Sequence, residues 1–140
     1  MRRLLASAVL VVGSLLAGCG GDDGSPTEPT SGSIAGTYTL RTVNGNNLPF
    51  TILQVGADKI ELMNETITVA EGGSFTQQGT VRLTESGTVT TESYADAGSY
   101  TRNGTSVTFR VNSDGTTITG TIANGSITAA ADGFSLVYRK

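Results

Sequence analysis

The chain has 140 residues, nine of them basic and twelve acidic, and it contains no histidine. Without histidine there is neither a base for a Ser-His nucleophile nor the commonest metal ligand, and the acidic balance disfavours nucleic acid, which requires a basic surface. We therefore expect a protein that is not an enzyme, holds no metal or cofactor and binds no nucleic acid.

The first eighteen residues have the three parts of a signal peptide. Arg2 and Arg3 form a basic start, residues 4–16 are an apolar run, and Ala17 and Gly18 are small. The apolar run is shorter than the ~20 residues that a membrane-spanning helix needs. We therefore predict that residues 1–18 are removed, which leaves seven basic and twelve acidic side chains.

The cleavage site Leu16-Ala17-Gly18-Cys19 resembles the lipobox of bacterial lipoproteins, in which the cysteine receives a diacylglycerol and then a further acyl chain. Cys19 is the only cysteine, so no internal disulfide can form. The resemblance implies a lipid anchor on Cys19, and Gly20 in place of aspartate favours the outer membrane of the cell envelope. The alternative is an ordinary secretory signal with a cysteine beside its cleavage site.

The remainder divides into a linker and one domain. Residues 19–32 are the lipidated cysteine and a flexible tether too polar to bury a core. Residues 33–140 are rich in Gly, Thr and short apolar alternations, which predicts an all-β domain. We expect a small antiparallel up-and-down barrel of eight to ten strands, because closure removes exposed edges. An immunoglobulin-like sandwich is the alternative, since alternation alone does not separate the two.

The first expected strand begins Gly36-Thr37-Tyr38, which resembles the Gly-x-Trp opening of lipocalin-like domains, with Tyr38 in the place of the tryptophan. The resemblance implies a cup for a small apolar molecule. Arg139 is, by position, the candidate for the arginine that lies behind that residue.

Two three-residue loops are expected in the N-terminal half. A loop Asn44-Gly45-Asn46 would join the first strand to a strand from Phe50 as a hairpin. A loop 85–87 would place Leu83 opposite Val89.

Between residues 58 and 73 the apolar positions change phase, which predicts a β-bulge. Two acidic pairs, Glu61 with Glu65 and Glu92 with Asp96, are the remaining candidates for acid–base chemistry. We interpret them as solvated charges, because no register argument places them inside the barrel.

Residues 98–139 are predicted to form a five-strand meander. Its two-residue turns are expected at Asn103-Gly104, Asp114-Gly115, Asn124-Gly125 and Asp132-Gly133. Those turns would oppose Tyr100 to Val107, Phe109 to Gly120, Ile122 to Ile127, and Ala129 to Leu136.

Two functions from different classes remain open. One is a binding module for a small apolar or amphipathic molecule, and the other is a structural or protein-interaction domain with a filled core. The many large apolar residues favour filling, with the Phe109 ring lying over Gly120. Arg102 is expected either to pair with an acidic head group or to reach into water at the rim. The candidate ligand-binding residues are Tyr38, Tyr100, Arg102, Phe109, Gly120 and Tyr138.

Overall fold

The computed structural model describes residues 32–140, so Cys19, the predicted leader and most of the predicted linker lie outside the described residues. The described residues contain strands and turns and no helix, which confirms the all-β prediction. The ten strands are β1 (Gly36–Val43), β2 (Asn46–Asn47), β3 (Phe50–Val55), β4 (Asp58–Val69), β5 (Ser74–Glu85), β6 (Thr88–Asn103), β7 (Ser106–Val111), β8 (Thr117–Ala123), β9 (Ser126–Ala131) and β10 (Phe134–Arg139).

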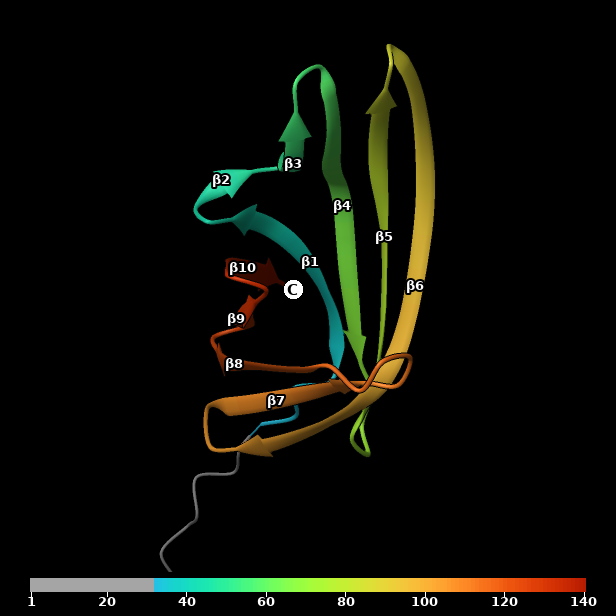
Figure 1. Ribbon diagram of the computed structural model, residues 1–140. Helices are drawn as coiled ribbons and strands as arrows, with labels where there is room; N and C mark the ends of the chain where they lie inside the picture. The colour runs from blue at the N-terminus through green and yellow to red at the C-terminus, as the bar shows by residue number, and fades with distance from the viewer. Residues whose placement is uncertain (1–31) are drawn as a thin grey trace, which may run out of the picture. The chain divides into compact units, whose positions relative to one another are not determined.

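The strands form one antiparallel sheet that closes on itself. Strands β4 to β10 follow one another as an up-and-down meander, and β1 pairs with both β10 and β4. The result is a closed barrel of eight strands with two additional strands, β2 and β3, as predicted (Figure 1). A single continuous sheet also decides against the two-sheet sandwich.

The two ends of the barrel differ. At the closed end, Gly36–Thr39 of β1 pair with Thr66–Val69 of β4 and seal the sheet. Towards the other end β1 leaves β4, and β3 takes its place beside β4 from Phe50 to Val55. We call this second end the open end. Strands β4, β5 and β6 are 12, 12 and 16 residues long, and they rise beyond the rest of the barrel there (Figure 1).

The four C-terminal turns give mixed results for the predicted registers. Those at Asn124-Gly125 and Asp132-Gly133 are confirmed, with Ile122 opposite Ile127 and Ala129 opposite Leu136. At the other two turns the predicted register is wrong by two residues, since Phe109 lies opposite Tyr100 on one side and Ile118 on the other. A shift of two keeps every side chain on its face, so Tyr100, Phe109 and Ile118 still belong to the core or pack against it.

The two predicted three-residue loops are also wrong. Asn44 and Gly45 form a two-residue turn into the short β2, and β3 pairs with β4 instead of β1. Ser86 and Gly87 form a two-residue turn that places Leu83 opposite Thr90 and leaves Val89 58% exposed. A one-residue error of this kind reverses the faces. The predicted bulge is confirmed, and it lies between Leu62 and Asn64.

Large side chains fill the closed half of the barrel. Val107 and Ile127 are fully buried there, beside Val69 and Tyr38. The Tyr38 hydroxyl donates to the Ile34 carbonyl at 2.7 Å, which holds the segment before β1 across this end. These contacts close one end of the interior with protein atoms.

Candidate ligand-binding site

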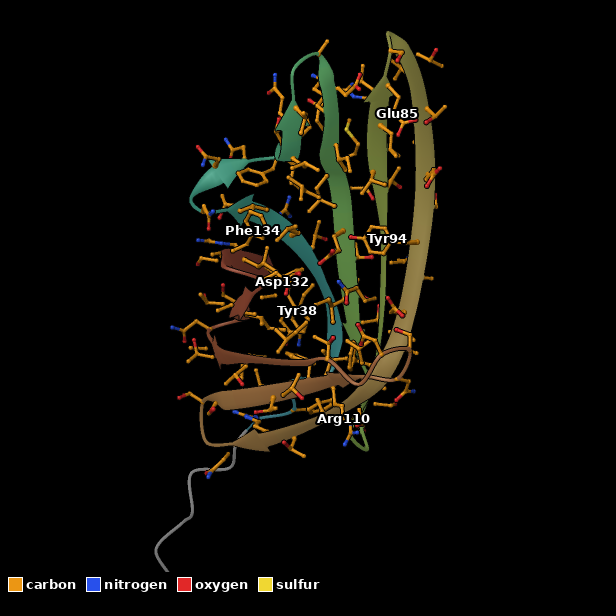
Figure 2. The ribbon with its side chains drawn as sticks, viewed as in Figure 1. Tyr38, Glu85, Tyr94, Arg110, Asp132 and Phe134 are labelled. Atoms are coloured by element: carbon orange, nitrogen blue, oxygen red, sulfur yellow. The ribbon has the colours of Figure 1, made fainter. Side chains whose placement is uncertain are left out.

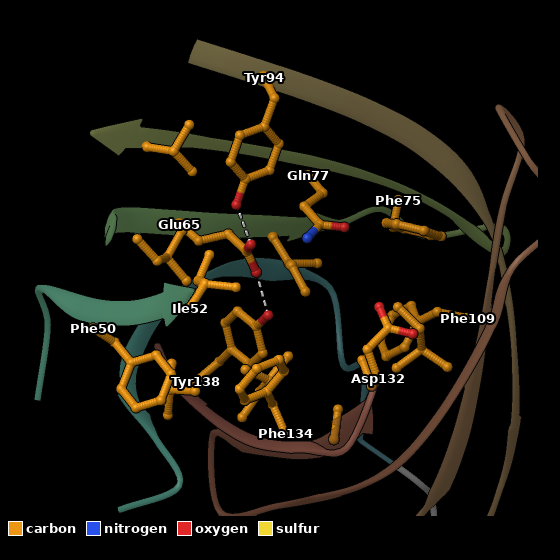
Figure 3. Close-up of a pocket in the computed structure, with 18 residues that line it drawn as sticks. Phe50, Ile52, Glu65, Phe75, Gln77, Tyr94, Phe109, Asp132, Phe134 and Tyr138 are labelled. Atoms are coloured by element: carbon orange, nitrogen blue, oxygen red, sulfur yellow. Dashed lines mark hydrogen bonds between the residues drawn. The ribbon is translucent and has the colours of Figure 1, made fainter. Parts of the chain in front are cut away.

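The open half of the barrel holds a cavity of about 300 Å³. This volume lies at the lower end of the range for small-molecule sites. The wall is mainly apolar and aromatic, with a few polar side chains (Figure 3). The lining residues are Val43, Phe50, Ile52, Leu62, Glu65, Ile67, Phe75, Gln77, Val81, Tyr94, Phe109, Ile118, Ala129, Ala131, Asp132, Phe134, Leu136 and Tyr138.

The mouth of the cavity carries aromatic rings from two separate parts of the sheet. Phe50 of β3 and Phe134 of β10 meet edge to face, with ring centroids 5.8 Å apart. Ile52 beside them is 40% exposed, and Asp132 stands in the exposed turn between β9 and β10. Because β3 is attached only to β4, this aromatic pair spans the place where β1 and β4 separate.

Glu65 is the one buried carboxylate among the lining residues, and it is only 5% exposed. Its two carboxylate oxygens each accept a hydrogen bond from a tyrosine hydroxyl, Oε2 from Tyr94 and Oε1 from Tyr138 (Figure 3). Tyr94 comes from β6 and Tyr138 from β10, so three separate strands contribute to this group. We call these three residues the Tyr-Glu-Tyr cluster.

Gly79 of β5 makes room for this cluster. It pairs with Glu65 on one side and Tyr94 on the other, so the tyrosine ring reaches the carboxylate by passing over a residue without a side chain. A Cβ atom on Gly79 would overlap the Tyr94 hydroxyl and ring. Figure 2 shows Tyr94 extending from β6 towards the interior. The glycine therefore determines the direction of the Tyr94 side chain.

The surroundings keep both tyrosines of the cluster protonated. Burial raises the pKa of Tyr138 well above its ordinary value, and the negative charge of Glu65 raises it further. The pKa of Tyr94 is raised by the same two causes in the same order. Both hydroxyls therefore stay donors to Glu65 at neutral pH.

Of the six predicted ligand-binding residues, Phe109 and Tyr138 line the cavity. Tyr38, Tyr100 and Arg102 lie towards the closed end. The Tyr100 hydroxyl donates to the Ala70 carbonyl at 3.0 Å. Arg102 donates to the carbonyls of Gly32 and Gly104 at 2.9 and 2.7 Å. The polar atoms of both side chains therefore bind main-chain carbonyls at this end.

Gly120, the sixth, also does not line the cavity. It lies opposite Val107 and Ala129, and a Cβ atom there would press against the backbone of Thr128 and Ala129. The predicted row with Phe109 opposite Gly120 is wrong. The Phe109 ring instead packs edge to face on Phe75, with centroids 5.1 Å apart.

The cation beside Tyr38 is not the predicted arginine. Arg139 is exposed, and Lys140 is the cation over the Tyr38 ring, with its Nζ 5.3 Å from the ring centroid. Burial raises the pKa of Tyr38, while Arg102 acts in the opposite direction.

The interpretation of the four acidic residues as solvated charges is wrong for Glu65 and for Glu61, which are 5% and 7% exposed. Glu61 forms ion pairs with Lys59 and Arg82, at 3.0 and 2.8 Å. The hydrogen bond from Arg82 is the main cause that lowers the pKa of Glu61. Glu92 is exposed, and Asp96 is half-buried. The bulge between Leu62 and Asn64 turns Glu65 onto the inner face, and the sequence signal for it was the phase change in β4.

The cavity offers apolar contact, hydrogen bonding and negative charge. Within residues 32–140, no group of three or more Asp, Glu, Cys or His side chains is placed to hold a metal ion. No model of a known protein family matches the chain, and a search of curated proteins finds no match either.

Proposed function

We propose that the protein is a lipid-anchored binding protein of the bacterial cell envelope, whose barrel holds a small apolar or amphipathic molecule. The observation that carries the proposal is the half-open apolar cavity of about 300 Å³ in the open half of the barrel. An engineered apolar cavity of roughly 150 Å³ takes a benzene molecule. About twice that volume accommodates a ligand larger than benzene, such as linked aromatic rings or one ring with a short chain.

The mouth of the cavity supports exchange with solvent. Phe50 and Phe134 are only half-buried, although both are large and apolar. Exposed aromatic surface around a concavity is typical of ligand sites. A small movement of β3 against the β9–β10 turn would widen the entrance between these two rings.

Titration with the neutral apolar dye N-phenylnaphthylamine tests the binding proposal. The assay uses the chain after residue 18 with Cys19→Ser, so that no acyl chain competes for the cavity. We expect saturable fluorescence enhancement that Ala131→Phe abolishes, because Ala131 lines the cavity. The matched control is Ala130→Phe, since Ala130 is exposed on the outer face. Equal dye binding by both variants would contradict the cavity as the binding site.

The anchor and the outer-membrane location are supported by the lipobox-like residues around Cys19. Several acyl chains bind a membrane stably, at ~0.8 kcal/mol per buried CH₂. We expect Cys19→Ser to abolish palmitate labelling and to release the protein from membranes. Labelling that persists in the variant would overturn the assignment of the anchor to Cys19.

A structural or protein-interaction role is the second candidate. Leu53 and Val55 of β3 are 53% and 69% exposed, on a hairpin that rises beyond the barrel (Figure 1). Exposed apolar clusters are typical of protein contacts. The dye titration separates the two candidates, because an interaction domain without a ligand gives no saturable signal that depends on Ala131.

A further inference from the structure

The buried carboxylate of Glu65 has no cationic partner among the described residues. The two ion pairs of residues 32–140 both involve Glu61, on the same strand. Glu65 instead has two neutral donors, the hydroxyls of Tyr94 and Tyr138. Hydrogen bonds from neutral groups reduce the cost of burying a charge but do not neutralise it.

The charges around the cavity are of one sign. Its lining contains the carboxylates of Glu65 and Asp132 and no lysine or arginine. Asp96, near Tyr94 on the same strand, adds to the negative potential at the Tyr94 hydroxyl. A cavity with low-dielectric walls strengthens the field of such charges. Cations are therefore favoured inside, and anions are disfavoured.

The Tyr-Glu-Tyr cluster also has hydrogen-bonding capacity left. A carboxylate has about four acceptor positions, and each Glu65 oxygen uses one of them for a tyrosine. A further donor from the cavity can therefore bind to Glu65 without displacing Tyr94 or Tyr138. An ammonium group provides such donors together with the missing positive charge.

The apolar part of the cavity wall determines which chemical group can carry the cation. Phe75, Phe109 and Ile67 line the cavity beyond the carboxylate, and Phe50 and Phe134 line its mouth. These surfaces suit a ring or short hydrocarbon chain. A bare metal ion is not favoured, because the described residues place no third ligating side chain beside Glu65.

We propose that the cavity binds small organic amines, with the protonated nitrogen at Glu65 and the apolar part against the phenylalanines. The proposal rests on the function proposed above and names its ligand class. Glu65 determines the preference for a cation, and Tyr94 and Tyr138 hold its carboxylate in position. Gly79 acts indirectly, because it leaves the space that the Tyr94 ring occupies.

Three probes with the same ring and nearly the same length test the charge preference: phenethylammonium, phenethyl alcohol and phenylacetate. Calorimetric titration of the chain after residue 18, with Cys19→Ser and no other substitution, should give the tightest binding for the ammonium. A charge-assisted hydrogen bond predicts about 10- to 100-fold over the alcohol, and phenylacetate should bind weakest. Equal affinities of the ammonium and the alcohol would overturn the proposal.

The variant Glu65→Gln keeps the size of the side chain and removes its charge. It also replaces one acceptor oxygen with an NH2 donor, from which one of the two tyrosine hydroxyls must then accept. It should lose the preference for the ammonium and keep the affinity for the alcohol within about threefold. Glu61→Gln is the matched control, because Glu61 lies on the same strand and pairs with Lys59 and Arg82. It should leave the preference unchanged. A preference retained in Glu65→Gln would contradict the role of Glu65.

The measurements separate the two proposals. If N-phenylnaphthylamine and the alcohol bind while the ammonium has no advantage, the amine proposal fails and the binding function stands. If neither the dye nor any of the three probes binds, both fail. Should Glu65→Gln not fold, the comparison of the three probes on the unmodified sequence still decides the question.

Discussion

The closed and open halves of this barrel have the same strand pattern but different interiors. In the closed half, Ile127 and Val107 are fully buried. In the open half, Ile118 and Leu136 lie on the same inner face, yet they are half-buried and border a cavity. Alternation of apolar residues therefore predicts which face is internal and does not predict whether the interior is filled.

The difference arises from the path of β1. Where β1 pairs with β4, the sheet is sealed and side chains from all eight strands converge. Beyond Thr39, β1 pairs on with β10 and β2, while β4 continues beside β3. At the open end the sheet is therefore not sealed between β1 and β4, and the cavity lies in this half of the barrel.

Truncating one isoleucine in each half gives the largest expected effect. Ile127→Ala should destabilise by about 2–5 kcal/mol, because it leaves a void in a packed region. Ile118→Ala removes the same atoms beside an existing cavity and should cost about 1 kcal/mol. Urea unfolding measures both. Equal losses would contradict the contrast between the two halves.

Two glycines distinguish stability from site geometry. Gly120→Ala should destabilise by about 1–3 kcal/mol through overpacking against β9, with dye binding retained. Gly79→Ala should cost a similar amount, but it should also displace Tyr94 from Glu65 and change ligand affinity. Gly32→Ala, with open space around its Cβ position, is the neutral control. Unaltered ligand affinity in Gly79→Ala would show that the position of Tyr94 does not affect ligand binding.

The dependence of stability on pH above 10 distinguishes the tyrosines of the Tyr-Glu-Tyr cluster from the tyrosine at the closed end. Tyrosines of the unfolded chain lose their protons near pH 10, while Tyr94 and Tyr138, whose pKa values are raised, keep theirs in the fold. The free energy of unfolding should therefore be unaffected by these groups below pH 10. Above that pH it should fall by about 1.4 kcal/mol per pH unit for each tyrosine.

Tyr138→Phe should make this decline shallower, as urea unfolding at a series of pH values would measure. In the closed half, Arg102 partly offsets the rise in the pKa of Tyr38, so Tyr38 should ionise before Tyr138 in an ultraviolet titration. An identical pH slope with and without the Tyr138 hydroxyl would count against its burial beside Glu65.

The turn sequences show how far register can be predicted. At Asn124-Gly125 and Asp132-Gly133 both residues adopt positive φ, the geometry expected of a two-residue hairpin turn. At Asn103-Gly104 only the glycine does, and the turn is centred one residue later. At Asp114-Gly115 a five-residue loop, residues 112–116, forms instead, with the Asp114 carboxylate accepting from the Thr116 amide. The dipeptide alone does not distinguish these cases.

The candidate site was less predictable than the fold, because it depends on one bulge. The change of phase in residues 58–73 predicted the bulge but not its position. Without that position, Glu61 and Glu65 are equivalent acidic residues on one strand. The structure places the bulge between them, and it sends Glu61 to Arg82 and Glu65 to the tyrosines.

The position of β1 also has a consequence for folding. Every other barrel strand pairs with its sequence neighbours, and such hairpins close over short stretches of chain. Strand β1 instead joins residues 100 positions apart, Thr39 and Arg139. Its ladder with β10 can form only when the last strand of the chain is available. Until then the sheet has open edges at β10 and β4, so docking of β1 protects the folding chain from edge-to-edge aggregation.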